Sequence, residues 1–206
     1  MKISDIERQW KDRPAGIVGD PRRFAVLVPL VERDGQAHLL FEVRADGMKH
    51  QPGEVCFPGG HMEPGERPLD CALRETGEEL NIPACAIRPI AELDTVWGPR
   101  GIIYPVLAQV EAAAVERLTA SPAEVKETFL VPVEFFLTEK PRVYVVPTEV
   151  RLGEQEAEFN EFVGFPGGYP WRLRRETVPA WHYEGRVIWG LTGRILLWTF
   201  RKDEWK

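Results

Sequence analysis

The chain has 206 residues, a formal net charge of −6 at pH 7 and 44% hydrophobic residues. This length and apolar content suit a packed core without disulfides, so we expect residues 1–206 to form a single domain. Proteins that bind a nucleic-acid backbone through charge are usually basic, so the acidic balance disfavours generic nucleic-acid binding but permits small phosphate ligands.

The cysteines and the apolar tracts bear on the location of the protein. Cys56, Cys71 and Cys85 have neither the number of a disulfide framework nor the paired spacing of a zinc site, which indicates free thiols in a reducing compartment. Residues 1–14 contain no apolar signal core. The most apolar tract, residues 187–200, is interrupted by Arg194 and is shorter than the ~20 residues that a membrane span needs. We therefore expect a cytoplasmic protein without a membrane partner.

In chain order, the pattern predicts mixed strands with few helices. Ile3, Ile6 and Trp10 have helical spacing, so residues 1–22 are expected to form a helical extension. A helix is predicted from Pro68 to about residue 80, since proline is tolerated at a helix start. A last helix is predicted with an apolar face formed by Ile188, Leu191, Ile195 and Trp198. Strands are predicted at residues 24–31, 38–44, 85–96, 102–110 and 142–152, and at the start of 125–137, where a short turn or helix follows.

Residues 164–185 are rich in Gly, Pro and aromatic side chains, which predicts a long ordered loop or an irregular hairpin. No linker divides the chain. The fold class predicted from this order is α+β, or an α/β/α sandwich around a mixed sheet.

The stretch "FPGGHMEPGERPLDCALRETGEELNI", residues 57–82, carries most of the chemistry. On a helix Glu75, Glu78 and Glu79 share one face, opposite an apolar stripe. A solvated acidic face is one interpretation. However, Arg74 is the only cation of residues 68–80 that relieves the repulsion, and a divalent cation would relieve it further, because Mg²⁺ binds a few carboxylates together with phosphate oxygens. The glycine-rich turn before the helix lets the backbone approach such a ligand closely.

This stretch resembles the Nudix box, G-x5-E-x7-R-E-U-x-E-E-x-G-U, in which U is a bulky aliphatic residue. Thr76 replaces an aliphatic residue and Asn81 replaces the last glycine, where asparagine tolerates a left-handed conformation. Neither departure alters an acidic position. The matching residues are Gly60, Glu66, Arg74, Glu75, Glu78, Glu79 and Ile82.

The resemblance implies a Nudix fold, with residues 57–82 as its loop and helix, and a hydrolase that cleaves a diphosphate with Mg²⁺ or Mn²⁺. It implies that Arg74 orients Glu75, and that Glu66 holds the loop or a water behind the metal ligands. The general base stays open between Glu75 and a later acid, Glu124 or Glu127, although both later acids also fit ordinary exposed positions. The implied catalytic residues are Arg74, Glu75 and Glu79, and the implied metal ligands are Glu75, Glu78 and Glu79 with a backbone carbonyl of Gly59 or Gly60.

Residues 40–60, "LFEVRADGMKHQPGEVCFPGG", resemble the signature of coenzyme A pyrophosphatases, L-L-T-x-R-S followed by R-x3-G-x3-F-P-G-G. Glu42 stands in the place of Thr and Lys49 in the place of the second Arg. The resemblance implies that Arg44, Lys49 and His50 bind the substrate phosphates. A structural ion pair between Arg44 and a box glutamate, and a plain surface role for His50, are the alternatives.

The implied substrate is coenzyme A or a derivative, and the implied products are 4′-phosphopantetheine and adenosine 3′,5′-bisphosphate. Two other interpretations stay open. One is a Nudix hydrolase for ADP-ribose or NADH. The other is a non-catalytic sensor, which typically lacks box carboxylates. The sequence leaves open the acylation state of the substrate, the number of metal ions, the role of residues 143–185 and whether the chain forms a homodimer.

Overall fold

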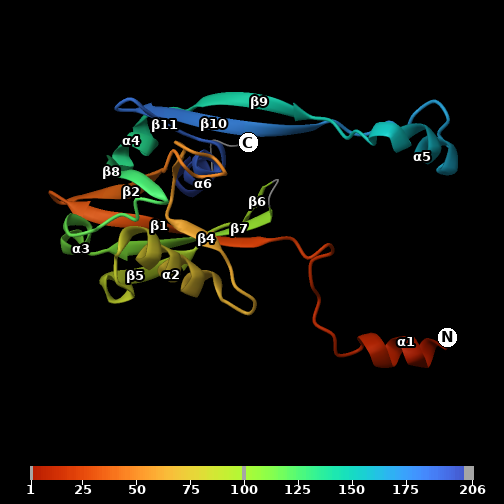
Figure 1. Cartoon of the computed structure of the whole chain (residues 1–206), viewed down its shortest axis with the longest axis horizontal. Helices are drawn as coiled ribbons and strands as arrows, with labels where there is room; N and C mark the ends of the chain where they lie inside the picture. The colour runs from red at the N-terminus through yellow and green to blue at the C-terminus, as the bar shows by residue number, and fades with distance from the viewer. Residues whose placement is uncertain (1, 99–100, 202–206) are drawn as a thin grey trace.

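A mixed sheet forms the centre of the computed structural model, which describes residues 2–98 and 101–201 (Figure 1). Its main path has the order β3-β2-β1-β7-β5; β4 pairs with β1, β6 with β7 and β8 with β2. The pairing of β1 with β7 is parallel, and the other described pairings are antiparallel. The strands are β1 (Arg23–Arg33), β2 (Gln36–Arg44), β3 (Val55–Cys56), β4 (Gly59–His61), β5 (Ile87–Glu92), β6 (Val96–Gly98), β7 (Gly101–Val110) and β8 (Val125–Pro132).

Helices cover both faces of this sheet. Figure 1 shows α2 on one side and α6 on the other, beneath a second sheet with the order β11-β10-β9. These elements and the remaining helices are α1 (Ile3–Trp10), α2 (Pro68–Leu80), α3 (Ala112–Glu116), α4 (Val133–Thr138), α5 (Glu156–Phe162), α6 (Gly190–Arg201), β9 (Arg142–Thr148), β10 (Arg174–Tyr183) and β11 (Arg186–Trp189). The predicted α+β fold, an α/β/α sandwich around a mixed sheet, is confirmed.

The alternation of strand residues divides the core into two clusters. In β1, Ala25 and Leu27 pack in the cluster that includes α2, and Val28 packs in the cluster that includes α6. In β2, Leu40 belongs to the α2 side, and Leu39 and Phe41 belong to the α6 side. The same alternation places the next even-numbered residue of β2, Glu42, on the α2 side of the sheet.

The ends of α2 follow local rules that the sequence shows. Pro68 occupies the start of the helix, where its missing N–H costs little. Asn81 ends it with φ 54° and ψ 32°, as predicted for a left-handed C-cap, and its N–H bonds the Gly77 carbonyl. Thr76 is fully buried and donates its hydroxyl to the Ala72 carbonyl at 2.7 Å, so the polar replacement in the box is satisfied.

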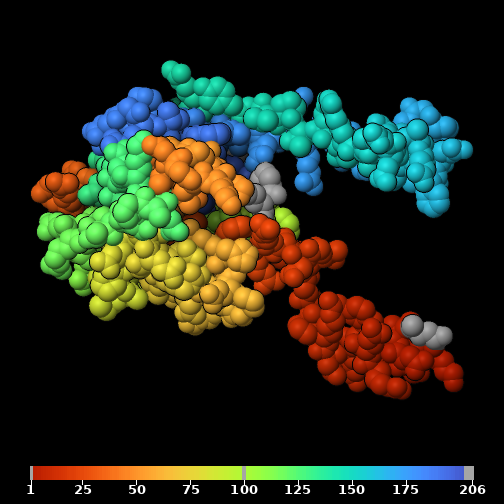
Figure 2. All heavy atoms as spheres, in the orientation of Figure 1, coloured from red at the N-terminus to blue at the C-terminus, as the bar shows by residue number. Residues whose placement is uncertain are grey.

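Three predictions about element boundaries need correction. Residues 174–183 form β10 and are not loop, because they pair with the distant β9 and form a hairpin with β11, so the hairpin alternative is closer than the loop. Ile188 lies in β11 and not in the last helix, which begins at Gly190. In the N-terminal extension only Ile3–Trp10 is helical, and none of its residues is buried. Figure 2 shows this extension and the α5 region projecting from the body of the molecule.

The close approach of α6 and β10 is expected to depend on Gly193. A Cβ built at Gly193 would lie 2.7 Å from the Pro179 carbonyl oxygen, whereas a Cβ at Gly47 would meet no atom within 4 Å. We expect Gly193→Ala to lower the free energy of unfolding by about 1–3 kcal/mol through overpacking, and Gly47→Ala to change it by less than about 0.5 kcal/mol. Chemical denaturation of both variants measures this, and equal stability of the two would contradict the packing described.

Candidate active site

The glycine turn lies directly against two carboxylates of α2. β4 pairs with β1 through Val26↔Gly59, and the N–H of Gly59 donates to Oε2 of Glu79 at 2.8 Å. A Cβ at Gly60 would collide with the carboxylate of Glu75. Gly59 has φ +150°, and a Cβ there would collide with the backbone of β1. Only glycine therefore allows the turn to fit between the sheet and the acidic helix.

Arg74 connects the acids at the outer side of the helix. Its Nε and Nη2 donate to Glu66 at 3.0 and 3.1 Å, and its Nη1 donates to Glu75 at 2.8 Å and to Glu78 at 3.4 Å. The Glu63 N–H also donates to Glu66 at 2.8 Å. These bonds, those from Arg74 first, lower the pKa of Glu66 to about 2. Glu66 thus lies where it can hold both the loop and Arg74, and the roles predicted for these residues stay predictions.

Glu79 lies deeper than the helical pattern suggested. The sequence placed it on an acidic face opposite the buried stripe, but its exposed fraction is 4%, while the Glu78 side chain is 60% exposed. Glu79 follows Ala72 and Thr76 at helical spacing, so it is part of the face that packs on the sheet. Burial first, and then the charge of Glu42, raise the pKa of Glu79 to about 9. The prediction of two separate stripes is wrong at this residue.

Glu42 is a site residue that the sequence reasoning missed. The upstream signature shows it only as a substitute for Thr, yet it is 1% exposed near the end of β2. Burial raises the pKa of Glu42 to about 7. The Cys56 hydrogen bond and the positive charge of Arg44 oppose this rise, and the negative charges of Glu124 and Glu75 reinforce it. A single acid within the apolar run of residues 39–43 was the signal that could have identified it.

The acids around the turn fit a divalent cation by their chemistry. Within residues 2–98 and 101–201, no group of three or more His, Cys, Asp or Glu side chains is arranged closely enough to hold a metal ion without rearrangement. However, burial raises the pKa of Glu75 and of Glu79. Arg74 only partly opposes this rise at Glu75, so the ionised forms of the two acids are not fully compensated by positive charge of the chain. The turn also leaves room for the Glu75 carboxylate at Gly60. Carboxylate oxygens are the donors that Mg²⁺ and Mn²⁺ prefer.

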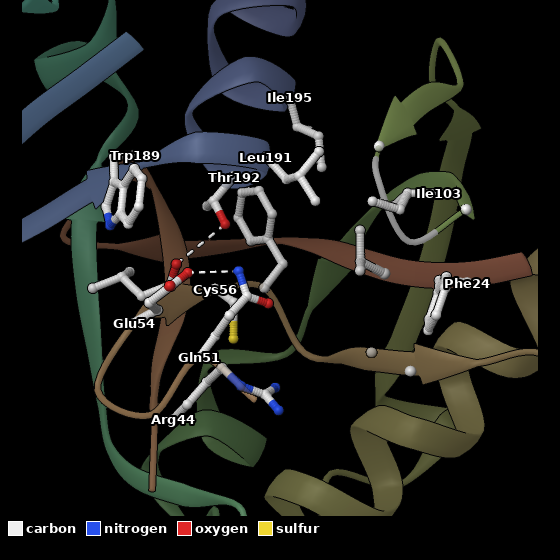
Figure 3. A pocket seen from close by; sticks show the side chains of 17 residues that line it. Phe24, Arg44, Gln51, Glu54, Cys56, Ile103, Trp189, Leu191, Thr192 and Ile195 are labelled. Atoms are coloured by element: carbon white, nitrogen blue, oxygen red, sulfur yellow. Dashed lines mark hydrogen bonds between the residues drawn. The ribbon is translucent and has the colours of Figure 1, made fainter. Parts of the chain in front are cut away.

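A cavity of about 220 Å³ opens beside the same turn. Figure 3 shows Arg44, Glu54 and Cys56 near one end of it, with Trp189, Leu191 and Thr192 contributed by β11 and α6. Gly59 and Gly60 belong to its wall, so one turn borders both the cavity and the acidic cluster. The aromatic and aliphatic part of this wall could not be predicted, because β11 and α6 are more than 100 residues from the signature.

Of the three predicted substrate-binding residues, only Arg44 lines the cavity. The Nε of Arg44 donates to the His50 carbonyl at 3.3 Å. Among the described residues, Arg44 forms no ion pair within 4.0 Å, so the alternative of an ion pair with a box glutamate is not observed. Lys49 and His50 are exposed and do not line the cavity. Their predicted binding to phosphates stays a prediction.

The two acids predicted as general bases have different surroundings. Glu127 accepts two hydrogen bonds from Arg186, at 2.9 and 3.0 Å, which lower its pKa. Glu124 is exposed, and its charge contributes to the raised pKa values of Glu42, Glu75 and Glu79. Glu124 therefore lies near the acidic cluster, whereas Glu127 is held in an ion pair.

Residues 21–148, more than half of the chain, match the NUDIX domain family, so the chain belongs to that family. This confirms the predicted family.

Similar proteins agree with the upstream signature. The mouse peroxisomal coenzyme A diphosphatase NUDT7 is 38% identical over 126 residues, which are 59% of this chain and 51% of the mouse protein. The human mitochondrial coenzyme A diphosphatase NUDT8 is 34% identical over 179 residues, 85% of this chain and 66% of the human protein. The match thus spans about half the length of the mouse relative. A solved MutT protein from Methanosarcina mazei Go1 is 19% identical with a TM-score of 0.46, over 60% of this chain and 86% of that one.

The buried acids predict an unusual pH dependence of stability when no divalent cation is present. The carboxyls of Glu42 and Glu79 keep their protons up to about pH 7 and pH 9 in the folded state, compared with a pKa of 4.5 for an ordinary Glu. Between pH 5.5 and 8 the folded state therefore binds more protons than the unfolded state, and stability falls as the pH rises. Thermal unfolding in a chelator should show this fall.

Glu79→Gln should flatten this slope, because it removes the buried charge and keeps an acceptor for the Gly59 N–H. Glu78→Gln is the matched control, since it alters an exposed carboxyl on the same helix. A wild-type melting temperature that is constant or rises from pH 5.5 to 8 would contradict the burial of uncompensated acids.

Proposed function

We propose that this protein is a divalent-cation-dependent diphosphatase that hydrolyses coenzyme A or a derivative to 4′-phosphopantetheine and adenosine 3′,5′-bisphosphate. The observation that carries the proposal is the shared turn, Gly59–Gly60, which borders both the acidic cluster and the cavity that Arg44 lines. A diphosphate across this turn would meet carboxylate-bound cations on one side and a guanidinium on the other. The similarity to coenzyme A diphosphatases of mouse and human supports the same substrate.

Each site residue has a role in this proposal. Glu75, Glu78 and Glu79 would hold Mg²⁺ or Mn²⁺, which would neutralise the diphosphate and activate a water. Arg74 would keep Glu75 oriented through its 2.8 Å hydrogen bond. Glu124 would accept the proton of the attacking water, since its charge acts on the cluster and no ion pair of the described residues holds it.

The cavity favours a substrate with an apolar part beside its phosphates. Apolar side chains of Phe24, Ile103, Trp189 and Leu191 line the region that adjoins Arg44. Largely apolar walls with a few polar groups are typical of small-molecule sites. Coenzyme A has such a composition, because its pantetheine arm is attached to the diphosphate. ADP-ribose and NADH have a sugar at the equivalent position.

The proposal predicts Mg²⁺-dependent release of adenosine 3′,5′-bisphosphate from coenzyme A. We expect Glu79→Gln to lower kcat at least 100-fold, because it removes a buried cation ligand, and Glu158→Gln, an exposed acid on α5, to leave it within twofold. Product chromatography with coenzyme A, ADP-ribose and NADH in parallel measures this.

Cleavage of ADP-ribose or NADH without cleavage of coenzyme A would retain the diphosphatase activity and refute the substrate. Absence of turnover with all three, in folded protein that binds a nucleotide, would favour the sensor interpretation.

The identity of the general base gives a second prediction. Glu124→Gln should lower kcat by about 100-fold or more, the usual contribution of a positioned base. Glu127→Gln should change kcat less than threefold and instead weaken the pairing with Arg186. Steady-state kinetics and thermal unfolding of both variants separate the two effects. A larger loss of kcat in Glu127→Gln than in Glu124→Gln would reverse this assignment.

We also propose that residues 1–206 act as one domain in the cytoplasm. Ile195 and Leu196 of α6 pack in the same core cluster as Val28 and Phe41, so the chain beyond the family match contributes to the sheet core. In the part of the chain that the structure describes, no helix is both long and apolar enough to cross a membrane. A homodimer and the absence of nucleic-acid binding stay predictions.

A further inference from the structure

The carboxyl group of Glu42 is buried with only one weak partner. Its Oε1 accepts a hydrogen bond from Cys56 Sγ at 3.2 Å. Its Oε2 is the one buried side-chain oxygen or nitrogen, among the residues that the structure describes, without any hydrogen-bond partner. Leaving a buried polar atom unsatisfied destabilises the folded state, and a charged one does so more. An oxygen in this position therefore indicates a partner that the protein chain itself does not supply.

The surroundings of Glu42 indicate the charge of that partner. Glu42 shares the α2 side of the sheet with Leu40, and Glu79 lies on the buried face of α2. Among the charges that act on Glu79, that of Glu42 is the strongest. Negative charges of Glu75 and Glu124 act on Glu42 as well, while Arg44 supplies the opposing positive charge. Acids thus outnumber cations around the unpaired oxygen.

We propose that Glu42 contributes an additional carboxylate to the divalent-cation site of Glu79, so that the bound cation compensates both buried acids. This inference rests on the proposed function, because it assumes that the cluster binds a cation. It goes beyond the family pattern, since the upstream signature has Thr at this position and the Nudix box does not include it. Glu42 and Glu79 come from β2 and α2, and the sandwich brings them together.

The alternative is a structural role for Glu42 as a neutral, protonated acid that bonds only Cys56. The two roles differ in their effect on cation affinity. An acid that compensates a cation raises the affinity when it is present, whereas a neutral acid leaves the affinity unchanged. The replacement Glu42→Gln keeps the shape and an oxygen acceptor and removes the charge, so it distinguishes the two.

The test is the binding of Mn²⁺ alone, measured by isothermal titration calorimetry without any nucleotide. We expect Glu42→Gln to weaken the Mn²⁺ affinity 10- to 100-fold, the range found for residues that support metal ligands. Glu54→Gln is the matched control and should change the affinity less than threefold. Glu54 also lines the region near Cys56, but it accepts a 2.7 Å hydrogen bond from Gln51.

Thermal unfolding gives a second readout and a check of folding. Without Mn²⁺, Glu42→Gln should melt at or above the wild-type temperature, because the unpaired acid is gone, and added Mn²⁺ should raise its melting temperature less than that of the wild type. Glu42→Thr, the residue of the signature, is the second variant if the first does not fold.

Equal Mn²⁺ affinity in the wild type and Glu42→Gln would overturn the inference and leave the proposed function intact, provided that coenzyme A is still cleaved. Failure of the wild type to bind Mn²⁺ at millimolar concentration would overturn both.

Discussion

The repulsion among carboxylates enclosed between α2 and the main sheet is the constraint on which the rest of the site depends. Glu42 and Glu79 are almost without contact with water, and Glu75 is half-buried beside them. In a region of low dielectric such charges interact far more strongly than on the surface. Isolated acids of this kind would move apart or neutralise. The two core clusters, one on each face of the sheet, prevent them from moving apart, so the pKa values of Glu42 and Glu79 are raised.

The backbone of the Gly59–Gly60 turn fixes the positions of two of these carboxylates. One N–H of the turn bonds Glu79, and the lack of a side chain at Gly60 provides the space that the Glu75 carboxylate occupies. The same turn borders the cavity that Arg44 and Trp189 line. Among the described residues, Arg44 forms no ion pair with the box glutamates. In the proposed function, a diphosphate at this turn would therefore find the guanidinium of Arg44 unpaired by these acids.

The features that the sequence predicted well depend on local spacing, and those it missed depend on contacts between distant segments. The start of α2 at Pro68 and its end at Asn81 follow from neighbouring residues. A helical wheel shows on which face of α2 Glu79 lies, but the burial of that face results from its packing on β1 and β4. Likewise, the pairing of Glu127 with Arg186 joins residues 59 positions apart, and no periodicity indicates it. Glu42 was visible as an acid in an apolar strand, yet only the sheet alternation shows which helix it faces.

Positive charge is distributed unevenly over the acidic cluster, because Arg74 contacts only the acids on its outer side. Arg74 serves the outer acids, bonding Glu66 and Glu75 and reaching Glu78. No comparable cation serves the inner pair, Glu42 and Glu79, among the ion pairs of residues 2–98 and 101–201. If Arg74 also reached the inner acids, it would compensate their negative charge, and the proposed metal ion would gain little by binding there. The Arg74 side chain compensates the outer acids, whereas the inner acids have no comparable partner, and it is at these inner acids that the proposed divalent cation would supply the missing positive charge.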